Sequence, residues 1–296
     1  MKKISVIIVT YNSTDLIIDC INSIYKYNDI GSENIEVIVV DNSHEVESRK
    51  MFSLLKQTYG NKLSLIKNQK NLGYGYGNNI GIEHSTGDII CIMNPDVRLS
   101  EPIFQKTLNK FENDGSLGLI GFKQKGGNNL SFYIKPEYHL SLFNSMAVKI
   151  FNKLNYFNSK FFFLSGALFF MDKCKFLDIK KFDNRIFLYS EESDISNRLI
   201  NKGYTINYIS KHKYIHLVNK RSLINSTTRH IMLQSAIYYL LKYKKNPNIF
   251  IKKKYIELIF KLFISKLLFK RDLSLNFKQS LAVLKQYHKN AKSKVV

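Results

Sequence analysis

The sequence has few cysteines and no long uncharged hydrophobic run, and both shortages exclude whole classes of protein. Cys20, Cys91 and Cys174 are scattered, odd in number and without CxxC or CxxxC spacing, so they form neither a disulfide framework nor a zinc site. The longest uncharged apolar stretch, residues 161–171, is far shorter than the ~20 residues that cross a bilayer. The apolar run at residues 4–9 is too short for a signal peptide. We therefore expect a cytoplasmic protein, soluble or peripherally attached to a membrane.

Acidic residues are scarce as well. The chain has 23 aspartates and glutamates against 45 lysines and arginines, a formal net charge of +22. Such an excess must face a negative partner, and nucleic acid, anionic lipid and phosphorylated substrates all qualify. No recognition helix, zinc finger or RNP-like signature accompanies the charge, which disfavours a nucleic-acid-binding protein. With only 4 prolines and 13% aromatic residues, the composition is that of a folded chain.

The first third of the chain alternates between strand and helix patterns. Four runs rich in β-branched residues are typical of strands buried in a parallel sheet. They cover residues 4–9, 36–40, 63–67 and 88–93. The alternation predicts an α/β sheet, in which ligands bind beyond the carboxyl ends of the strands. Residues from about 120 to 160 give no clear pattern, and from about 228 onward the pattern is helical and basic.

Four sets of polar residues stand where such a sheet would gather them at one edge. They are Thr10-Tyr11-Asn12, Asp41-Asn42, Asn94-Pro95-Asp96 and the acidic cluster Glu191, Glu192 and Asp194. Any one of these sets, taken singly, is an ordinary turn or helix cap. Their joint occurrence in this order indicates a functional site.

These motifs resemble those of a known family. Residues 5–12 (SVIIVTYN), 40–43 (VDNS), 71–81 (NLGYGYGNNIG) and 94–96 (NPD) resemble the donor-binding half of the inverting GT-A glycosyltransferases of family 2. Residues 182–198, with LYSEESD at 188–194, resemble that family's acidic catalytic segment. The resemblance covers roughly residues 3–222 and is closest to the bacterial rhamnosyltransferase-like branch.

The resemblance implies both architecture and activity. We expect a GT-A fold with a mostly parallel sheet flanked by helices, a catalytic domain at 1–225 (donor half 1–100, acceptor half 101–225) and a helical basic region at 226–296. The implied activity is metal-dependent transfer of a sugar from dTDP-rhamnose or a UDP-sugar to a glycan or lipid-linked acceptor, in bacterial cell-surface polysaccharide synthesis. A catalytically inactive scaffold with the same fold stays open, because Asn94 and Glu192 depart from the family's pattern.

A divalent metal, Mn²⁺ or Mg²⁺, would neutralise the leaving diphosphate. By resemblance, Asp96 takes the last place of the family's Asp-x-Asp motif and is the expected metal ligand. Asn94 replaces the first aspartate and removes one charge. A histidine on a later strand completes the metal shell in similar enzymes, and the spacing favours His216 over His212.

The resemblance places the general base on Glu192, where the family usually has aspartate. Because glutamate is one methylene longer, Glu191 or Asp194 stays open as an alternative. A solvated acidic helix start, favoured by the helix dipole, is the non-catalytic explanation of this cluster. The resemblance also assigns residues that bind the nucleotide sugar. They are Thr10, Tyr11, Asn12, Asp41, Asn71, Gly73, Asn78, Asn94 and Asp96.

The basic segment 252–271 is the last feature of note. On a helical wheel Lys254, Glu257, Lys261 and Ser265 form one polar stripe, and apolar residues fill most of the rest. The pattern favours an interfacial helix on anionic lipid at the inner face of the cell membrane. The alternative is a helix that packs on the core and keeps a solvated edge.

Overall fold

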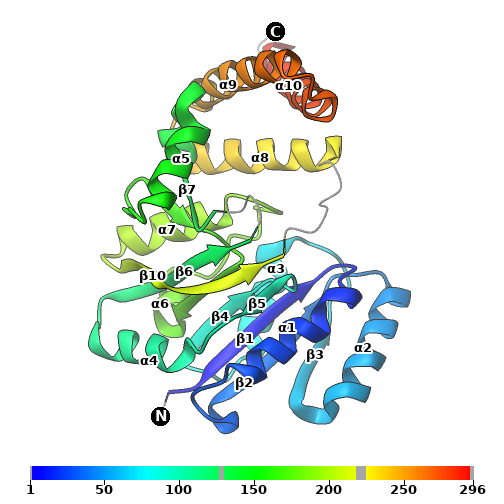
Figure 1. Cartoon of the computed structure of the whole chain (residues 1–296), viewed down its shortest axis with the longest axis vertical. Coiled ribbons are helices and arrows are strands. Elements are labelled where there is room, and N and C mark those ends of the chain that lie inside the picture. The colour runs from blue at the N-terminus through cyan, green and yellow to red at the C-terminus, as the bar shows by residue number, and fades with distance from the viewer. Residues whose placement is uncertain (1, 127–129, 218–224, 294–296) are drawn as a thin grey trace. The chain divides into compact units, whose positions relative to one another are not determined.

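The computed structural model describes residues 2–126, 130–217 and 225–293 and divides into two compact units (Figure 1). The first unit comprises residues 1–133, 163–187 and 191–218 and contains a large sheet. The second comprises residues 134–162, 188–190 and 219–296 and is built mainly from helices.

The sheet of the first unit has eight strands in the order β3-β2-β1-β4-β9-β6-β10-β5. They are β1 (Ile4–Thr10), β2 (Ile35–Asp41), β3 (Leu63–Lys67), β4 (Ile89–Met93), β5 (Val97–Leu99), β6 (Leu117–Lys125), β9 (Leu168–Asp172) and β10 (Thr205–His216). β1 to β4 pair in parallel, as do β6 and β10, whereas β9 is antiparallel to both β4 and β6. The expected α/β fold with a mostly parallel sheet is confirmed.

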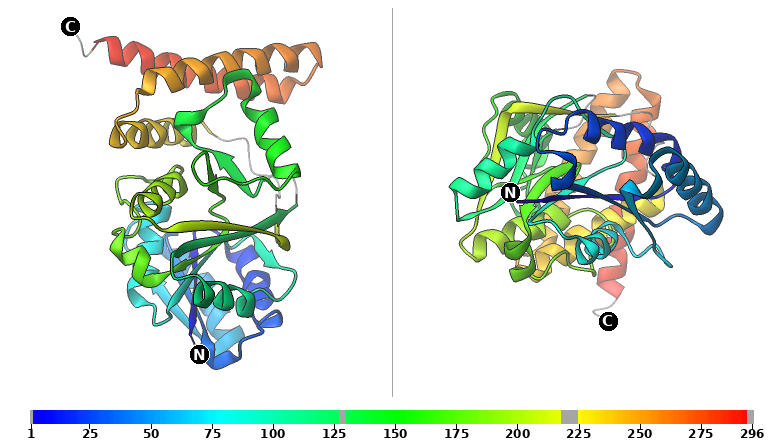
Figure 2. Two further views of the ribbon diagram at one scale, coloured as in Figure 1. Left: turned by 90° about the vertical axis from the view of Figure 1, so that its left-hand side faces the viewer. Right: turned by 90° about the horizontal axis from the view of Figure 1, so that it is seen from below.

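Helices cover both faces of this sheet. They are α1 (Thr14–Lys26), α2 (Glu45–Tyr59), α3 (Tyr74–His84), α4 (Phe104–Asn113), α6 (Lys173–Asp178) and α7 (Glu191–Asn201). α1, α2 and α4 lie on one face, and α3, α6 and α7 lie on the other (Figure 2). Ile17, Met51 and Leu108 therefore share one apolar cluster with alternate strand residues such as Val6. This burial on both faces explains the near-continuous apolar strands.

The apolar run at residues 161–171 does not form one continuous strand. It divides into β8 (Phe162–Leu164), which pairs with β7 (Phe132–Ile134), and β9 of the large sheet. Ser165, Gly166 and Ala167 separate the two strands, and this break carries the backbone past the acidic end of α7.

The second unit is formed by α5 (Asn144–Lys153), α8 (Ser226–Lys242), α9 (Pro247–Leu267) and α10 (Arg271–Ser293), with short 3₁₀ turns η3 (Pro136–Tyr138) and η4 (Ser141–Phe143). Leu233 and Ile237 of α8, Leu258 of α9 and Leu284 of α10 contribute to its apolar cluster. The basic helical region expected from about residue 228 is confirmed. Within the described ranges, no helix combines the length and the apolar character needed to cross a membrane.

Candidate active site

The polar residues that follow β1, β2 and β4 lie at one edge of the sheet. Thr10 and Asp41 are partners in the β1–β2 ladder, and Asn94 follows β4, the other neighbour of β1. Because these strands are parallel and adjacent, their carboxyl ends meet, as the sequence predicts.

Asp41 is completely buried and is held by two hydroxyl groups. Thr10 Oγ1 and Ser43 Oγ donate to Asp41 Oδ1 over 2.8 and 2.7 Å. Ser43 Oγ also accepts the Asn12 N–H at 2.7 Å, which ties the loop after β1 to this carboxylate, with Tyr11 half exposed beside it. Among the described residues, Asp41 Oδ2 has no hydrogen-bond partner. A buried unpaired carboxylate oxygen is unfavourable, so it indicates an acceptor reserved for a ligand.

The side chains of Asp96 and His216 lie in direct contact. His216 Nε2 lies 3.1 Å from Asp96 Oδ2, and the imidazole is almost completely buried. The antiparallel β5–β10 ladder sets His216 opposite Val97, and the Leu217 N–H donates to the Asp96 carbonyl over 2.9 Å. The backbone therefore fixes the separation of the two side chains. His212 instead lies against Glu101, with its Nδ1 2.8 Å from the carboxylate.

Gln124, to which no sequence motif points, orients His216. Its side-chain oxygen lies 3.1 Å from His216 Nδ1 and accepts the Tyr214 hydroxyl over 2.9 Å. When Nδ1 donates to this oxygen, the lone pair of Nε2 faces Asp96. Gln124 stands between Lys123 and Lys125 at the end of β6, in the same alternating register as Phe122, and this position is the signal that could have identified it.

Glu192 lies at the start of α7 and is partly buried. Its carboxylate contacts Gly166 so closely that a Cβ on this glycine would come within 2.1 Å of Glu192 Oε1. Burial raises the pKa of Glu192 to about 7, against hydrogen bonds from the backbone N–H groups of Glu192 and Gly166, which lower it. A carboxylate with this pKa suits a general base at neutral pH.

The other two acidic residues of the cluster have different surroundings. Glu191 is buried, and burial followed by the charge of Glu192 holds its pKa well above the usual range. Asp194 is fully buried and accepts a 2.9 Å hydrogen bond from Arg198 Nε. Arg198 also donates to the carbonyl groups of Ile179 and Lys181. Asp194 therefore anchors α7 to the chain before it.

The break between β8 and β9 connects the two halves of this site. The Asn94 N–H donates to the Ala167 carbonyl over 2.9 Å, and the Tyr74 hydroxyl donates to the Gly166 carbonyl over 2.8 Å. The same short segment thus touches the turn that carries Asp96 and the carboxylate of Glu192. Tyr74 is a second residue of the site that the motifs did not single out.

The glycine-rich stretch 71–81 serves helix packing. Gly73 adopts a φ of 102° before α3, and its N–H donates to Asn71 Oδ1 over 3.1 Å. A Cβ on Gly81 would come within 2.5 Å of Ile7, so the glycine lets α3 approach β1 closely. Asn78 is fully buried and donates to the Tyr74 carbonyl of its own helix over 3.0 Å. The expected contacts of Asn71, Gly73 and Asn78 with a donor stay predictions.

No group of three or more histidine, cysteine or acidic side chains suited to a metal occurs in the described part of the chain. The pair Asp96 and His216 is nevertheless a chemically suitable partial donor set. Two ligand atoms that bind one cation at about 2.1 Å and at right angles lie about 3.0 Å apart. The observed 3.1 Å between Oδ2 and Nε2 fits that arrangement.

Known proteins share parts of this sequence and the whole of this fold. The chain is 32% identical over 108 residues to the Minor teichoic acid biosynthesis protein GgaB of Bacillus subtilis (strain 168), which is 36% of this chain and 12% of GgaB. It is 29% identical over 119 residues to the uncharacterized glycosyltransferase YfnE of the same organism, 40% of this chain and 29% of YfnE. The matches therefore span only a minor part of either relative.

Solved structures show the same fold at low sequence identity. The mannosyltransferase PcManGT from Pyrobaculum calidifontis, in complex with GDP-Man and Mn²⁺, aligns over 99% of this chain and 75% of its own, with a TM-score of 0.61 and 17% identity. S. aureus TarS aligns over 80% of this chain and 40% of its own, with a TM-score of 0.54 and 19% identity. The expected GT-A fold is thereby confirmed. Since the family model for glycosyl transferase family 2 matches residues 5–185, the chain belongs to glycosyl transferase family 2.

Proposed function

We propose that this family 2 glycosyltransferase moves a sugar, with inversion, from dTDP-rhamnose or a UDP-sugar to a glycan or lipid-linked acceptor. The setting is bacterial cell-surface polysaccharide synthesis at the inner face of the membrane. The teichoic acid relative GgaB supports a cell-surface polymer as the product class. The resemblance of the motifs to the rhamnosyltransferase-like branch supports dTDP-rhamnose among the donors.

The observation that carries this proposal is the position of the Glu192 carboxylate. It contacts Gly166, whose neighbour Ala167 is hydrogen-bonded to Asn94 of the turn that carries Asp96. A general base and a residue for the leaving diphosphate are therefore linked through one short segment. In a single displacement, Glu192 accepts the proton of the acceptor hydroxyl as its oxygen attacks the anomeric carbon, and the sugar–phosphate bond breaks.

Asp96 and His216 are the residues that would hold Mn²⁺ or Mg²⁺. A carboxylate with an imidazole nitrogen is an acceptable donor pair for Mn²⁺, and Gln124 presents the imidazole in a suitable orientation. When bound, the cation supplies positive charge to the leaving diphosphate. The Mn²⁺ and GDP-Man of the mannosyltransferase structure are consistent with this role.

Asp41 would recognise the nucleoside. Its Oδ2 is a buried acceptor, and Thr10 and Ser43 fix the orientation of the carboxylate. A nucleobase N–H or a ribose hydroxyl would donate to Oδ2, with Tyr11 and Asn12 beside it.

Thermal unfolding of the purified protein with a panel of nucleotide sugars, with and without Mn²⁺, tests this proposal. We expect one donor to raise the unfolding temperature most, and only in the presence of metal, because a ligand of the native state stabilises it in proportion to the logarithm of saturation. Asp96→Ala should abolish the part of this increase in unfolding temperature that depends on metal. If no nucleotide sugar changes the unfolding temperature at any metal concentration, the proposal is wrong.

A further inference from the structure

α9 presents its apolar side to solvent and its polar stripe to the protein. Glu257 is 1% exposed and Ser265 is 3% exposed, although both belong to the polar stripe of the helix. In contrast, Ile259, Phe260, Phe263, Leu267, Leu268 and Phe269 of α9 and of the turn after it are each between 45% and 91% exposed. We call these six residues the α9 apolar surface. The polar stripe is therefore not the solvated edge that the alternative explanation of this helix requires.

Specific contacts of Glu257 hold α9 in this orientation. Its carboxylate accepts from Lys254 Nζ over 2.8 Å and from Ser145 Oγ of α5 over 2.9 Å, and it lies 3.1 Å from His139 Nε2. Lys261 Nζ completes the cluster at 2.5 Å from Glu257 Oε1. Because a buried charge needs these partners, the helix cannot rotate its apolar side inward without leaving Glu257 unpaired.

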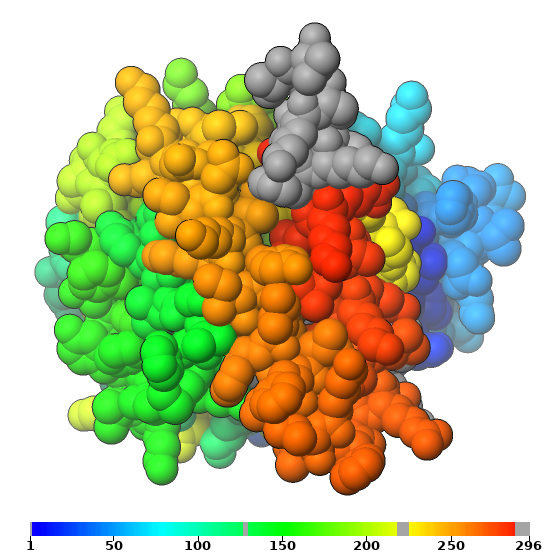
Figure 3. Space-filling view, turned by 90° about the horizontal axis from the view of Figure 1, so that it is seen from above, coloured from blue at the N-terminus to red at the C-terminus, as the bar shows by residue number. Residues whose placement is uncertain are grey.

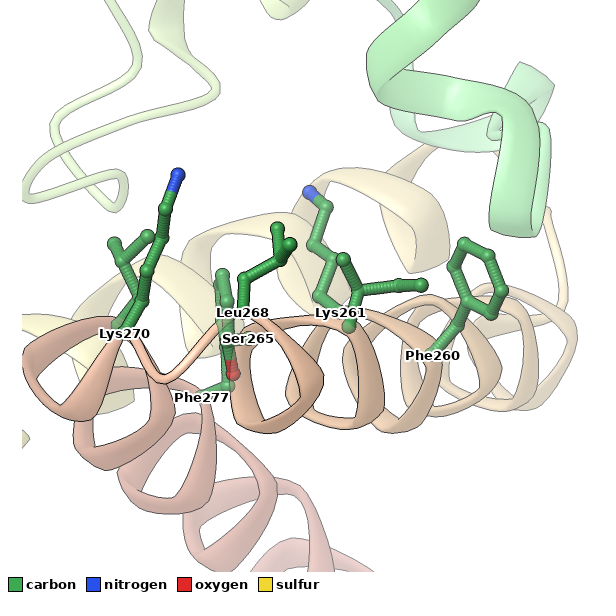
Figure 4. Close-up of a pocket in the computed structure, with 8 residues that line it drawn as sticks. Phe260, Lys261, Ser265, Leu268, Lys270 and Phe277 are labelled. Carbon is green, nitrogen blue, oxygen red and sulfur yellow. The ribbon is translucent and has the colours of Figure 1, made fainter.

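α9 and α10 lie side by side across the face of the molecule shown in Figure 3. A hollow of about 260 Å³ opens between them, lined mainly by apolar side chains that include Leu268 and Phe277. Lys261 and Lys270 extend to the same side as Leu268 in the close-up (Figure 4). The Lys261 ammonium is engaged by Glu257 and Ser145, so Lys270 is the cation that this hollow adds beside the apolar side chains.

The charge around the α9 apolar surface is strongly positive. Residues 247–296 hold eleven lysines and one arginine against one glutamate and one aspartate. Of these, Lys266, Lys270 and Arg271 are exposed beside the turn between α9 and α10. A symmetric dimer through this surface would place each of these cations near its own copy, which disfavours a second chain as the occupant. The fitting partner is both apolar and negative.

We propose that the α9 apolar surface, with Lys266, Lys270 and Arg271 around it, inserts into the interface of a membrane that contains anionic lipid. Phe263, Leu267 and Phe269 enter the acyl boundary, to a depth of roughly 5–10 Å, while the cations bind lipid phosphates. The inference extends the proposed function, since it gives the enzyme a surface for reaching a lipid-linked acceptor. It requires neither donor nor metal.

The sequence contains no tryptophan, so one introduced tryptophan reports on its own surroundings. We would prepare the full chain as Phe263→Trp and Phe269→Trp, with Val46→Trp as the matched control, because Val46 is 78% exposed on α2 of the first unit. Vesicles of phosphatidylcholine, with and without phosphatidylglycerol, are then added. We expect a blue shift and quenching by brominated lipid for Phe263→Trp and Phe269→Trp with anionic vesicles only, and neither for Val46→Trp.

Flotation with the same vesicles measures how much the cations contribute to membrane binding. The variant Lys266→Gln/Lys270→Gln/Arg271→Gln should reduce partition between about tenfold and a hundredfold at low salt, with a smaller effect at high salt. Lys106→Gln/Lys110→Gln on α4, where both lysines are exposed, should leave partition unchanged.

Two results would overturn the inference. One is the absence of any spectral change with anionic vesicles for both tryptophan variants, given circular dichroism that shows them folded. The other is a blue shift without vesicles that depends on protein concentration, which would assign the surface to a second copy of the chain. If the wild-type protein bound vesicles but transferred no sugar, that result would count against the proposed function and not against this inference.

Discussion

At the scale of single residues, the surroundings of Glu192 support the general-base role that we propose for it. Gly166 and the backbone of Glu192 hold the carboxylate, and its pKa of about 7 lets it accept a proton at neutral pH. Burial and the charge of Glu192 raise the pKa of Glu191 beside it, and Asp194 is paired with Arg198. The three neighbouring carboxyl groups therefore have different surroundings, which their sequence spacing alone leaves undecided.

Removal of the carboxylate tests the role of Glu192 directly. We expect Glu192→Gln to lower kcat by about 10²–10⁴-fold, the range attributed to general-base catalysis, and to leave the donor Kd within a few-fold of the wild type. Single-turnover kinetics together with calorimetric donor binding measure the two quantities. Glu112→Gln, an exposed change on α4, is the control. Unchanged kcat in Glu192→Gln would remove Glu192 from the mechanism.

Glu192 should also make stability depend on pH. Its pKa is raised from 4.5 to about 7, so the protonated form is favoured in the folded state. The resulting stabilisation is present below pH 4.5 and is lost as the pH rises through about 7. Glu192→Gln stays neutral, so it should match the wild type at about pH 4 and exceed it by roughly 3 kcal/mol at about pH 8. Urea unfolding at both pH values measures the difference in unfolding free energy between the variant and the wild type. The same difference at about pH 4 and about pH 8 would contradict the prediction.

Gly166→Ala should separate activity from stability. The new Cβ would come within 2.1 Å of Glu192 Oε1, the end of a flexible side chain that can move away. We therefore expect a fall in kcat of on the order of tenfold or more with little change in unfolding free energy, since a misplaced base loses catalysis. Gly115→Ala, where nothing lies within 4 Å of the added Cβ, should leave kcat unchanged. Equal kcat values for the two variants would show that the contact does not matter.

At the scale of elements, the orientation of α9 depends on the buried cluster around Glu257. Burial opposes the charge, yet hydrogen bonds from His139, Lys254 and Lys261 hold the pKa of Glu257 far below its usual range. Such a depressed pKa stabilises the fold above the unfolded value of 4.5, and the stabilisation is lost as the pH falls below it. The second unit should therefore be sensitive to acid.

Glu257→Gln tests whether the buried cluster stabilises the orientation of α9. Loss of one member of a buried charge cluster leaves the others uncompensated and costs about 3–5 kcal/mol. Hydrogen exchange of α9 and urea unfolding at neutral pH should both reveal this destabilisation. Glu112→Gln, an exposed change on α4 of the first unit, should cost much less. If the two variants were equally stable, the cluster would not be what orients the helix.

The elements themselves were largely predictable where they are regular. The strands at residues 4–9, 36–40, 63–67 and 88–93 correspond to β1 to β4 within about one residue, because buried parallel strands have near-continuous apolar sequences. Residues 144–153 form the helix α5, although their region gave no clear pattern. The helix has only ten residues, two of them asparagines, which are weak helix formers, and Val148 is its one buried apolar residue, so the helical pattern is short.

At the scale of the whole molecule, the two ligands that we propose, a nucleotide sugar and anionic lipid, are assigned to different units of the chain. The net charge of +22 suits both a nucleoside diphosphate and an anionic lipid, and composition does not separate them. The carboxylates and polar groups of the site lie in the first unit, and the α9 apolar surface with its lysines lies in the second.

Hydrogen exchange of the full chain with each ligand in turn checks this division. Donor with Mn²⁺ should slow exchange by tenfold or more, as an order of magnitude, in peptides that contain residues 94–96, 165–167 and 191–194. Anionic vesicles should instead protect residues 259–271. Protection of residues 259–271 by the donor alone would contradict the assignment of the two ligands to separate surfaces.

The sequence by itself determined the α/β fold, the polar edge of the sheet and the family, because these depend on local runs and on short motifs such as NPD at 94–96. Only the tertiary structure placed Gln124 against His216 and Gly166 against Glu192, since these pairs are 92 and 26 residues apart and have no periodic signal. The direction in which α9 faces was likewise decided by Glu257 meeting His139 and Ser145, 118 and 112 residues away. A helical wheel gives the stripes of a helix, whereas contacts across the chain decide which stripe is buried.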